Sequence, residues 1–87
     1  MFFVYIIYSE LADCYYKGFS TNVERRLQEH NEGQSRFTSC QSDWKLIHLE
    51  SFASKSNALI REKRLKKYSK SQIEELSKTK KNLLNGG

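Results

Sequence analysis

The chain has 87 residues, a formal net charge of +5 at pH 7, and a composition that includes five Phe, five Tyr and one Trp. This length predicts one domain, and the aromatic content excludes a disordered chain. The apolar run at residues 2–8 is far shorter than the ~20 residues that span a bilayer, so we expect no membrane association. Cys14 and Cys40 have no CxxC spacing and no signal peptide accompanies them. These features predict a reduced, cytoplasmic protein.

The positive charge is concentrated in the last third of the chain. Residues 61–81 contain nine Lys or Arg against three Glu, a net charge of +6, whereas the other residues contain six bases and seven acids. A concentrated basic segment favours a polyanionic partner, most simply a nucleic acid. The alternative is a solvated, lysine-rich helical surface without a partner.

The N-terminal third predicts a β-hairpin. Residues 2–8 (FFVYIIY) are β-branched and aromatic on both faces, which is typical of a central strand. The polar residues 10–13 provide a turn, and residues 14–18 provide the second strand. The short connection predicts that the two strands are antiparallel neighbours.

A helix is expected to follow the hairpin. Thr21 or Asn22 can cap its N-terminus, and the helix should run to about Asn31, with Gly33 as its C-terminal stop. Residues 34–43 are polar and predict a loop.

The second half of the chain predicts a third strand followed by a helix. Residues 44–52 (WKLIHLESF) alternate in polarity, which indicates a strand. Ser54 or Ser56 can then cap a helix that extends to Lys67.

A more polar helix is expected over residues 69–81, and residues 83–87 are expected to fray. Residues 1–82 would then form the single domain. The order strand, strand, helix, strand, helix, helix predicts an α+β fold with a small three-stranded, mainly antiparallel sheet flanked by helices.

Charged side chains occur on the apolar faces of two of these helices. The inward stripe of residues 56–67 consists of Ala58, Leu59, Glu62 and Leu65. The same spacing in the earlier helix groups Val23, Arg26, Leu27 and His30. A carboxylate among apolar residues is costly unless it is paired, hydrogen-bonded or bound to a metal. The pattern therefore indicates a polar site between the two helices.

An ordered set of residues carries a family resemblance. Its members are Tyr5, Tyr16-x-Gly18, Arg26, His30 and Glu62. With the loop Arg36-Phe37-Thr38 and the strand opening at Trp44, this set resembles the GIY-YIG nuclease family over residues 3–68. The chain is similar to the small stand-alone bacterial members and to the N-terminal domain of excinuclease C. It departs from the family pattern in reading Phe3-Val4 before Tyr5 and in carrying Lys17.

The resemblance implies a GIY-YIG-like fold and a divalent-metal-dependent endonuclease. Such an enzyme would hydrolyse phosphodiester bonds in DNA, including single-stranded, branched or damaged forms, in repair, recombination or processing. It implies that Glu62 binds one Mg²⁺ or Mn²⁺ and that Arg26 contacts phosphate oxygens. Tyr5 would activate water, Tyr16 would position phosphate or relay a proton, and His30 would assist.

Basic side chains near this set are the expected contacts to nucleic acid, with DNA favoured over RNA. They are Lys17, Arg25, Arg36, Arg61, Arg64, Lys66 and Lys67. Asn82 is not assigned the role of the asparagine that many family members carry near the end of the domain, because it lies far from Glu62 in the sequence.

Other interpretations of the same residues stay open from the sequence alone. Tyr5 and Tyr16 could fill an aromatic core, and Arg26 and Glu62 could form a buried salt bridge. The chain could be a non-catalytic nucleic-acid-binding module that uses its basic C-terminal helices. It could also have a structural role, with a protein partner or as a homodimer.

Overall fold

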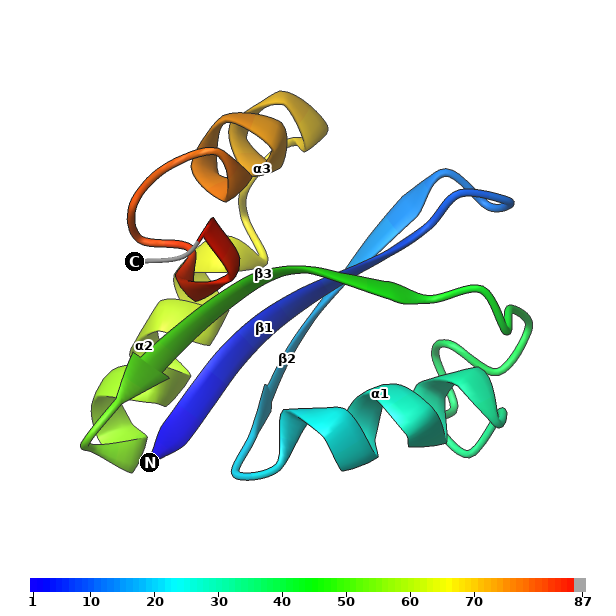
Figure 1. The fold of residues 1–87 in the computed structure, drawn as a ribbon, viewed down its shortest axis with the longest axis horizontal. Helices are drawn as coiled ribbons and strands as arrows, with labels where there is room; N and C mark the ends of the chain where they lie inside the picture. Colours follow the sequence, from blue (N-terminus) through cyan, green and yellow to red (C-terminus); the bar gives the residue numbers. More distant parts are fainter. Residues whose placement is uncertain (86–87) are drawn as a thin grey trace.

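The computed structural model describes residues 1–85, which form a three-stranded antiparallel sheet with helices on both faces (Figure 1). The strands are β1 (Phe2–Ser9), β2 (Cys14–Ser20) and β3 (Lys45–Phe52), in the order β2-β1-β3. The predicted α+β class is confirmed. Within residues 1–85, no helix is both long and apolar enough to cross a membrane.

The central strand β1 is buried on both faces, as its sequence predicted. Val4 and Ile6 point into a core shared with the C-terminal helices, whereas Tyr5 and Ile7 point into a core on the opposite face. The register places Tyr5 directly opposite Gly18 of β2. This pairing decides how the Tyr5 side chain can lie.

Helix α1 (Val23–Asn31) covers the Tyr5 face. Its N-cap is Asn22, whose side chain accepts a hydrogen bond from the backbone N–H of Arg25 at 3.2 Å. Gly33 follows the helix with a φ of +78°, a left-handed conformation that glycine adopts without strain. The expected cap and stop residues are therefore the ones that the structure uses.

Helix α2 (Lys55–Leu65) covers the opposite face, with Ser54 as its N-cap. Ala58 and Leu65 are fully buried, as expected, but Leu59 is exposed and Glu62 is only half-buried. The predicted stripe was therefore wrong for Leu59. The helix turns Arg61 toward the sheet instead, because a buried partner on β3 binds its guanidinium.

Helix α3 (Lys70–Ser77) begins with a capping box between Ser69 and Gln72 and packs Ile73 and Leu76 into the core. It ends four residues earlier than predicted. The expected fraying also differs from the structure, which folds Leu83–Asn85 into a short 3₁₀ helix, η1, that contacts β3. Residues 86–87 lie outside the described part of the chain.

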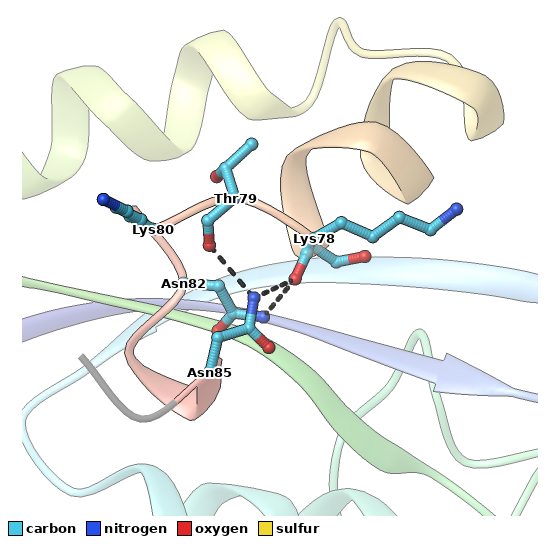
Figure 2. A pocket seen from close by; sticks show the side chains of 6 residues that line it. Lys78, Thr79, Lys80, Asn82 and Asn85 are labelled. Carbon is cyan, nitrogen blue, oxygen red and sulfur yellow. Dashed lines mark hydrogen bonds between the residues drawn. The ribbon is translucent and has the colours of Figure 1, made fainter.

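Asn82 holds this C-terminal segment in place. Its amide N–H groups donate to the carbonyl oxygens of Ile47 and Ser77, both at 2.8 Å, and its oxygen accepts from Leu49 N–H at 3.1 Å. Asn85 donates to the same Ser77 carbonyl, beside a hollow of about 480 Å³ (Figure 2). The Asn82 amide thus joins β3 to the end of the chain, and the Asn85 amide joins η1 to the end of α3 and the residues after it.

We expect Asn82→Ala to lower the free energy of unfolding by about 2–4 kcal/mol, because it removes a fully buried side chain and leaves partly buried backbone groups of β3 without partners. Urea denaturation measures the change. Asn85→Ala is the matched control, since Asn85 is exposed, and should cost less than about 1 kcal/mol. Equal losses in the two variants would contradict this account of Asn82.

Candidate active site

Tyr5 forms the buried centre of the site. Its side chain is 1% exposed and lies across the backbone of β2 at Gly18. A Cβ atom at Gly18 would lie 2.4 Å from both the Cζ and the Oη atom of Tyr5, far inside van der Waals contact. Glycine is therefore required at this position to make room for the phenol ring.

A chain of hydrogen bonds joins Tyr5 to α1 and to the loop after it. The Oη atom of Tyr5 lies 2.8 Å from Nε2 of His30, and Nδ1 of His30 lies 2.7 Å from Oγ1 of Thr38. His30 and Thr38 are both fully buried. The indole N–H of Trp44 donates to the Thr38 carbonyl at 3.1 Å, which anchors the Thr38 end of this series of hydrogen bonds.

Two further residues complete the cluster on this face. The Tyr16 ring, half-buried on β2, lies with its centroid 4.8 Å from that of His30. Arg26, on α1, lies close enough to the Tyr5 hydroxyl to lower the pKa of Tyr5, and its Nη1 is bound to Glu29 at 2.7 Å. Arg26 therefore pairs with Glu29, and the salt bridge to Glu62 considered from the sequence is not formed.

Burial sets the protonation states of the central pair. Loss of solvent raises the pKa of Tyr5 to about 12, against the lowering effect of Arg26, and the Tyr16 and Glu62 charges act in the raising direction. Burial also lowers the pKa of His30, and the positive charge of Arg26 adds to this lowering. At neutral pH the phenol is therefore protonated and the imidazole is uncharged.

Glu62 approaches from α2, at the margin of the site. Its charge is among those that raise the pKa of Tyr5, and its side chain is half-buried. None of the ion pairs among residues 1–85 involves Glu62. A free, partly exposed carboxylate is a suitable ligand for a hard divalent cation that keeps several waters and binds phosphate.

The protein would supply few other ligands to such a cation. Among residues 1–85, no three His, Cys, Asp or Glu side chains converge as a metal cage. Cys14 and Cys40 are both free thiols. One partly exposed carboxylate suits a hard divalent cation that keeps several waters, and the described donors do not form a structural zinc site.

A buried ionic cluster on the other face was not predicted. Glu50 of β3 accepts two hydrogen bonds from Arg61, at 2.9 and 3.0 Å, and its Oε2 lies 2.6 Å from Nε2 of His48. The Arg61 guanidinium also lies 5.9 Å from the centroid of the Tyr68 ring. The ion pair therefore turns the Arg61 side of α2 toward β3, in the turn of helix that also carries Glu62.

The basic residues assigned to nucleic acid from the sequence occupy different environments. Arg61 differs most from that expectation, since Glu50 already occupies its guanidinium. Lys17 is half-buried on β2, and burial lowers its pKa. Arg25 lies 3.8 Å from Glu29 and stays largely exposed. The remaining four are exposed: Arg36, Arg64, Lys66 and Lys67.

Comparison with known families agrees with this arrangement. The family model described as the GIY-YIG catalytic domain matches residues 1–80. The chain belongs to the GIY-YIG family. The family is one of nuclease domains, so this protein has a nuclease fold, and the family resemblance drawn from Tyr5, Tyr16-x-Gly18, Arg26, His30 and Glu62 is confirmed.

Relatives of this GIY-YIG chain match it over most of their length. The UPF0213 protein of Halobacterium salinarum is 45% identical over 78 residues, which cover 87% of this chain and 99% of that protein. The UPF0213 protein of Syntrophus aciditrophicus is 41% identical over 79 residues, covering 87% and 88%. The solution NMR structure of a UPF0213 protein from Bacillus halodurans is 29% identical, covers 93% of this chain and 87% of that one, and gives a TM-score of 0.58.

We expect Gly18→Ala to destabilise the protein by about 1–3 kcal/mol, because the new methyl group must displace the Tyr5 ring. In a Tyr5→Leu background, which lacks the outer ring atoms, the same substitution should cost much less. Urea unfolding of the four proteins gives the coupling between the two positions. A coupling below about 0.5 kcal/mol would contradict the contact.

The Glu50 cluster predicts a specific pH dependence. Burial alone would raise the pKa of Glu50, but hydrogen bonds from His48 and Arg61 outweigh it and hold the pKa at about 2, below the usual 4.5. The stabilisation is thus complete above pH 4.5 and is lost as the pH falls toward 2. The difference in unfolding free energy between wild type and Glu50→Gln should shrink across this range. If the unfolding free energies of the two proteins instead changed in parallel with pH, the lowered pKa of Glu50 would be contradicted.

Proposed function

We propose that the protein is a divalent-metal-dependent endonuclease that hydrolyses phosphodiester bonds in DNA. The observation that carries the proposal is the buried Tyr5–His30 hydrogen bond, with Arg26 beside it and the free carboxylate of Glu62 at its margin. A nuclease fold supplies the context. A plain aromatic core would not require an arginine and a carboxylate to act on the same phenol.

The protonation states favour a relay over direct base catalysis by tyrosinate. With a pKa of about 12, Tyr5 is not ionised at neutral pH. We assign the proton of neutral His30 to Nδ1, which donates to Thr38, so that Nε2 accepts from the Tyr5 hydroxyl. As water attacks phosphorus, Tyr5 takes the proton of the water and passes its own to Nε2 of His30.

The other residues of the proposed site bind the phosphate and stabilise its negative charge. Arg26 neutralises the equatorial phosphoryl oxygens, and Tyr16 positions the phosphate beside His30. Glu62 would hold the divalent cation, which supplies Lewis-acid polarisation of the phosphate and stabilises the leaving oxygen. The bond from phosphorus to the leaving oxygen then breaks, and that oxygen takes a proton from solvent.

Exposed basic residues are proposed to bind the rest of the DNA. Arg25 and Arg36 border the α1 side of the site, and Arg64, Lys66 and Lys67 lie where α2 ends. Contacts of this kind to phosphates give affinity that falls with salt and depends little on sequence.

Glu62→Gln tests the proposal. The wild-type protein should cut at least one of single-stranded, duplex or branched DNA, with RNA assayed alongside, in the presence of Mg²⁺ or Mn²⁺. We expect the variant to lose about 100-fold or more in cleavage rate, with a dissociation constant within about twofold of wild type, because the amide no longer provides an anionic ligand.

Glu75→Gln is the matched control, since it removes one exposed acidic charge from α3 and leaves the site intact. It should cleave at the wild-type rate. Binding of nucleic acid by the wild type without cleavage under any of these conditions, unchanged in Glu62→Gln, would contradict the nuclease proposal and support a non-catalytic binding module.

A further inference from the structure

An exposed aromatic side chain lies in the loop that is hydrogen-bonded to the site, and it has no role in the mechanism above. Phe37 is 80% exposed, in the loop between α1 and β3. Such exposure leaves a large apolar surface in water, with no folding benefit to explain it.

The backbone around Phe37 is firmly anchored. The N–H of Thr38 donates to the Ser35 carbonyl at 3.2 Å, which places Arg36 and Phe37 at the centre of a tight turn. Ser35 and Thr38 are both buried, and the Thr38 carbonyl accepts from the indole of Trp44. The turn therefore holds its two central side chains out in solvent while fixing their position.

The same turn is joined directly to the catalytic cluster. Thr38 is hydrogen-bonded to His30, which in turn is hydrogen-bonded to Tyr5. Phe37 is one peptide step, about 3.8 Å between Cα atoms, from Thr38. The turn that carries Phe37 is thus fixed to the same hydrogen-bond chain as Tyr5 and His30.

The chemistry of the turn favours an unpaired base as the occupant of the Phe37 ring. Arg36, which is exposed, places a positive charge next to the ring, and the whole chain carries a net charge of +5. An aromatic platform beside a cation is the arrangement by which proteins bind single-stranded nucleic acid. In a continuous duplex, neighbouring bases already cover each base face.

We propose that Phe37 stacks on an unpaired base and that Arg36 contacts its phosphate. The protein would then select nucleic acid with an unpaired nucleotide beside the cleaved bond. The placement of this nucleotide beside the cleaved bond rests on the proposed nuclease function, whereas the stacking itself does not.

Binding without metal tests the platform separately from cleavage. Fluorescence anisotropy would compare a single-stranded oligonucleotide with a duplex of the same sequence. Phe37→Ala should weaken single-strand binding by about 5- to 150-fold and leave duplex binding within about twofold, and Phe37→Trp should retain single-strand affinity. Leu11→Ala is the control, since it removes an apolar side chain that is 81% exposed in the β1–β2 turn, and it should bind as wild type.

Three results would overturn the platform: no single-strand binding by the wild type, equal effects of Phe37→Ala on both nucleic acids, or a dimer that becomes a monomer in Phe37→Ala. The last, measured by light scattering, would assign Phe37 to self-association. If Phe37→Ala selectively loses single-strand binding and the wild type cleaves none of the nucleic acids, the platform is supported and the nuclease proposal is contradicted. Unchanged cleavage by Phe37→Ala, together with equal effects on single-strand and duplex binding, would support the nuclease proposal and overturn the platform.

Discussion

The close approach of Tyr5 to Gly18 is the constraint on which the site depends. Pairing of β1 with β2 places the two residues opposite each other, and the missing Cβ of Gly18 lets the phenol ring lie across the neighbouring strand. The hydroxyl thereby meets His30 under α1 while the ring stays buried. That burial raises the pKa of Tyr5 and keeps its hydroxyl protonated at neutral pH, so the close approach sets both the geometry and the protonation state of Tyr5.

The proposed site draws on helices from both faces of the three-stranded sheet. Helix α1 supplies Arg26 and His30, and α2, which packs on β1 and β2 from the other side, supplies Glu62. Arg61, which directly precedes Glu62 in α2, pairs with Glu50 of β3 and touches none of the proposed catalytic side chains. This pair holds the Arg61 side of α2 against the sheet, and breaking such a pair leaves an uncompensated charge.

Local signals predicted the strands, the Asn22 cap of α1 and the inward stripe that carries Arg26 and His30, because each depends on residues close together in the sequence. The partners of Glu50 and Asn82 could not be predicted in the same way. Arg61 lies 11 residues from Glu50, and Asn82 bonds to a strand more than 30 residues away. Such pairings form only when the whole chain is packed. In α2 the inward-facing residues include Arg61, which pairs with Glu50, and Leu59 is exposed.

The central claim is that Glu62 and the Tyr5 cluster form one metal-assisted centre. NMR spectra of ¹⁵N-labelled protein titrated with Mn²⁺ test it most directly, because the paramagnetic ion broadens only nearby amide signals. The account predicts broadening around Glu62, Tyr5 and Tyr16 that disappears in Glu62→Gln. Broadening confined to other carboxylates, such as Asp13 and Asp43, and unchanged in that variant, would contradict it.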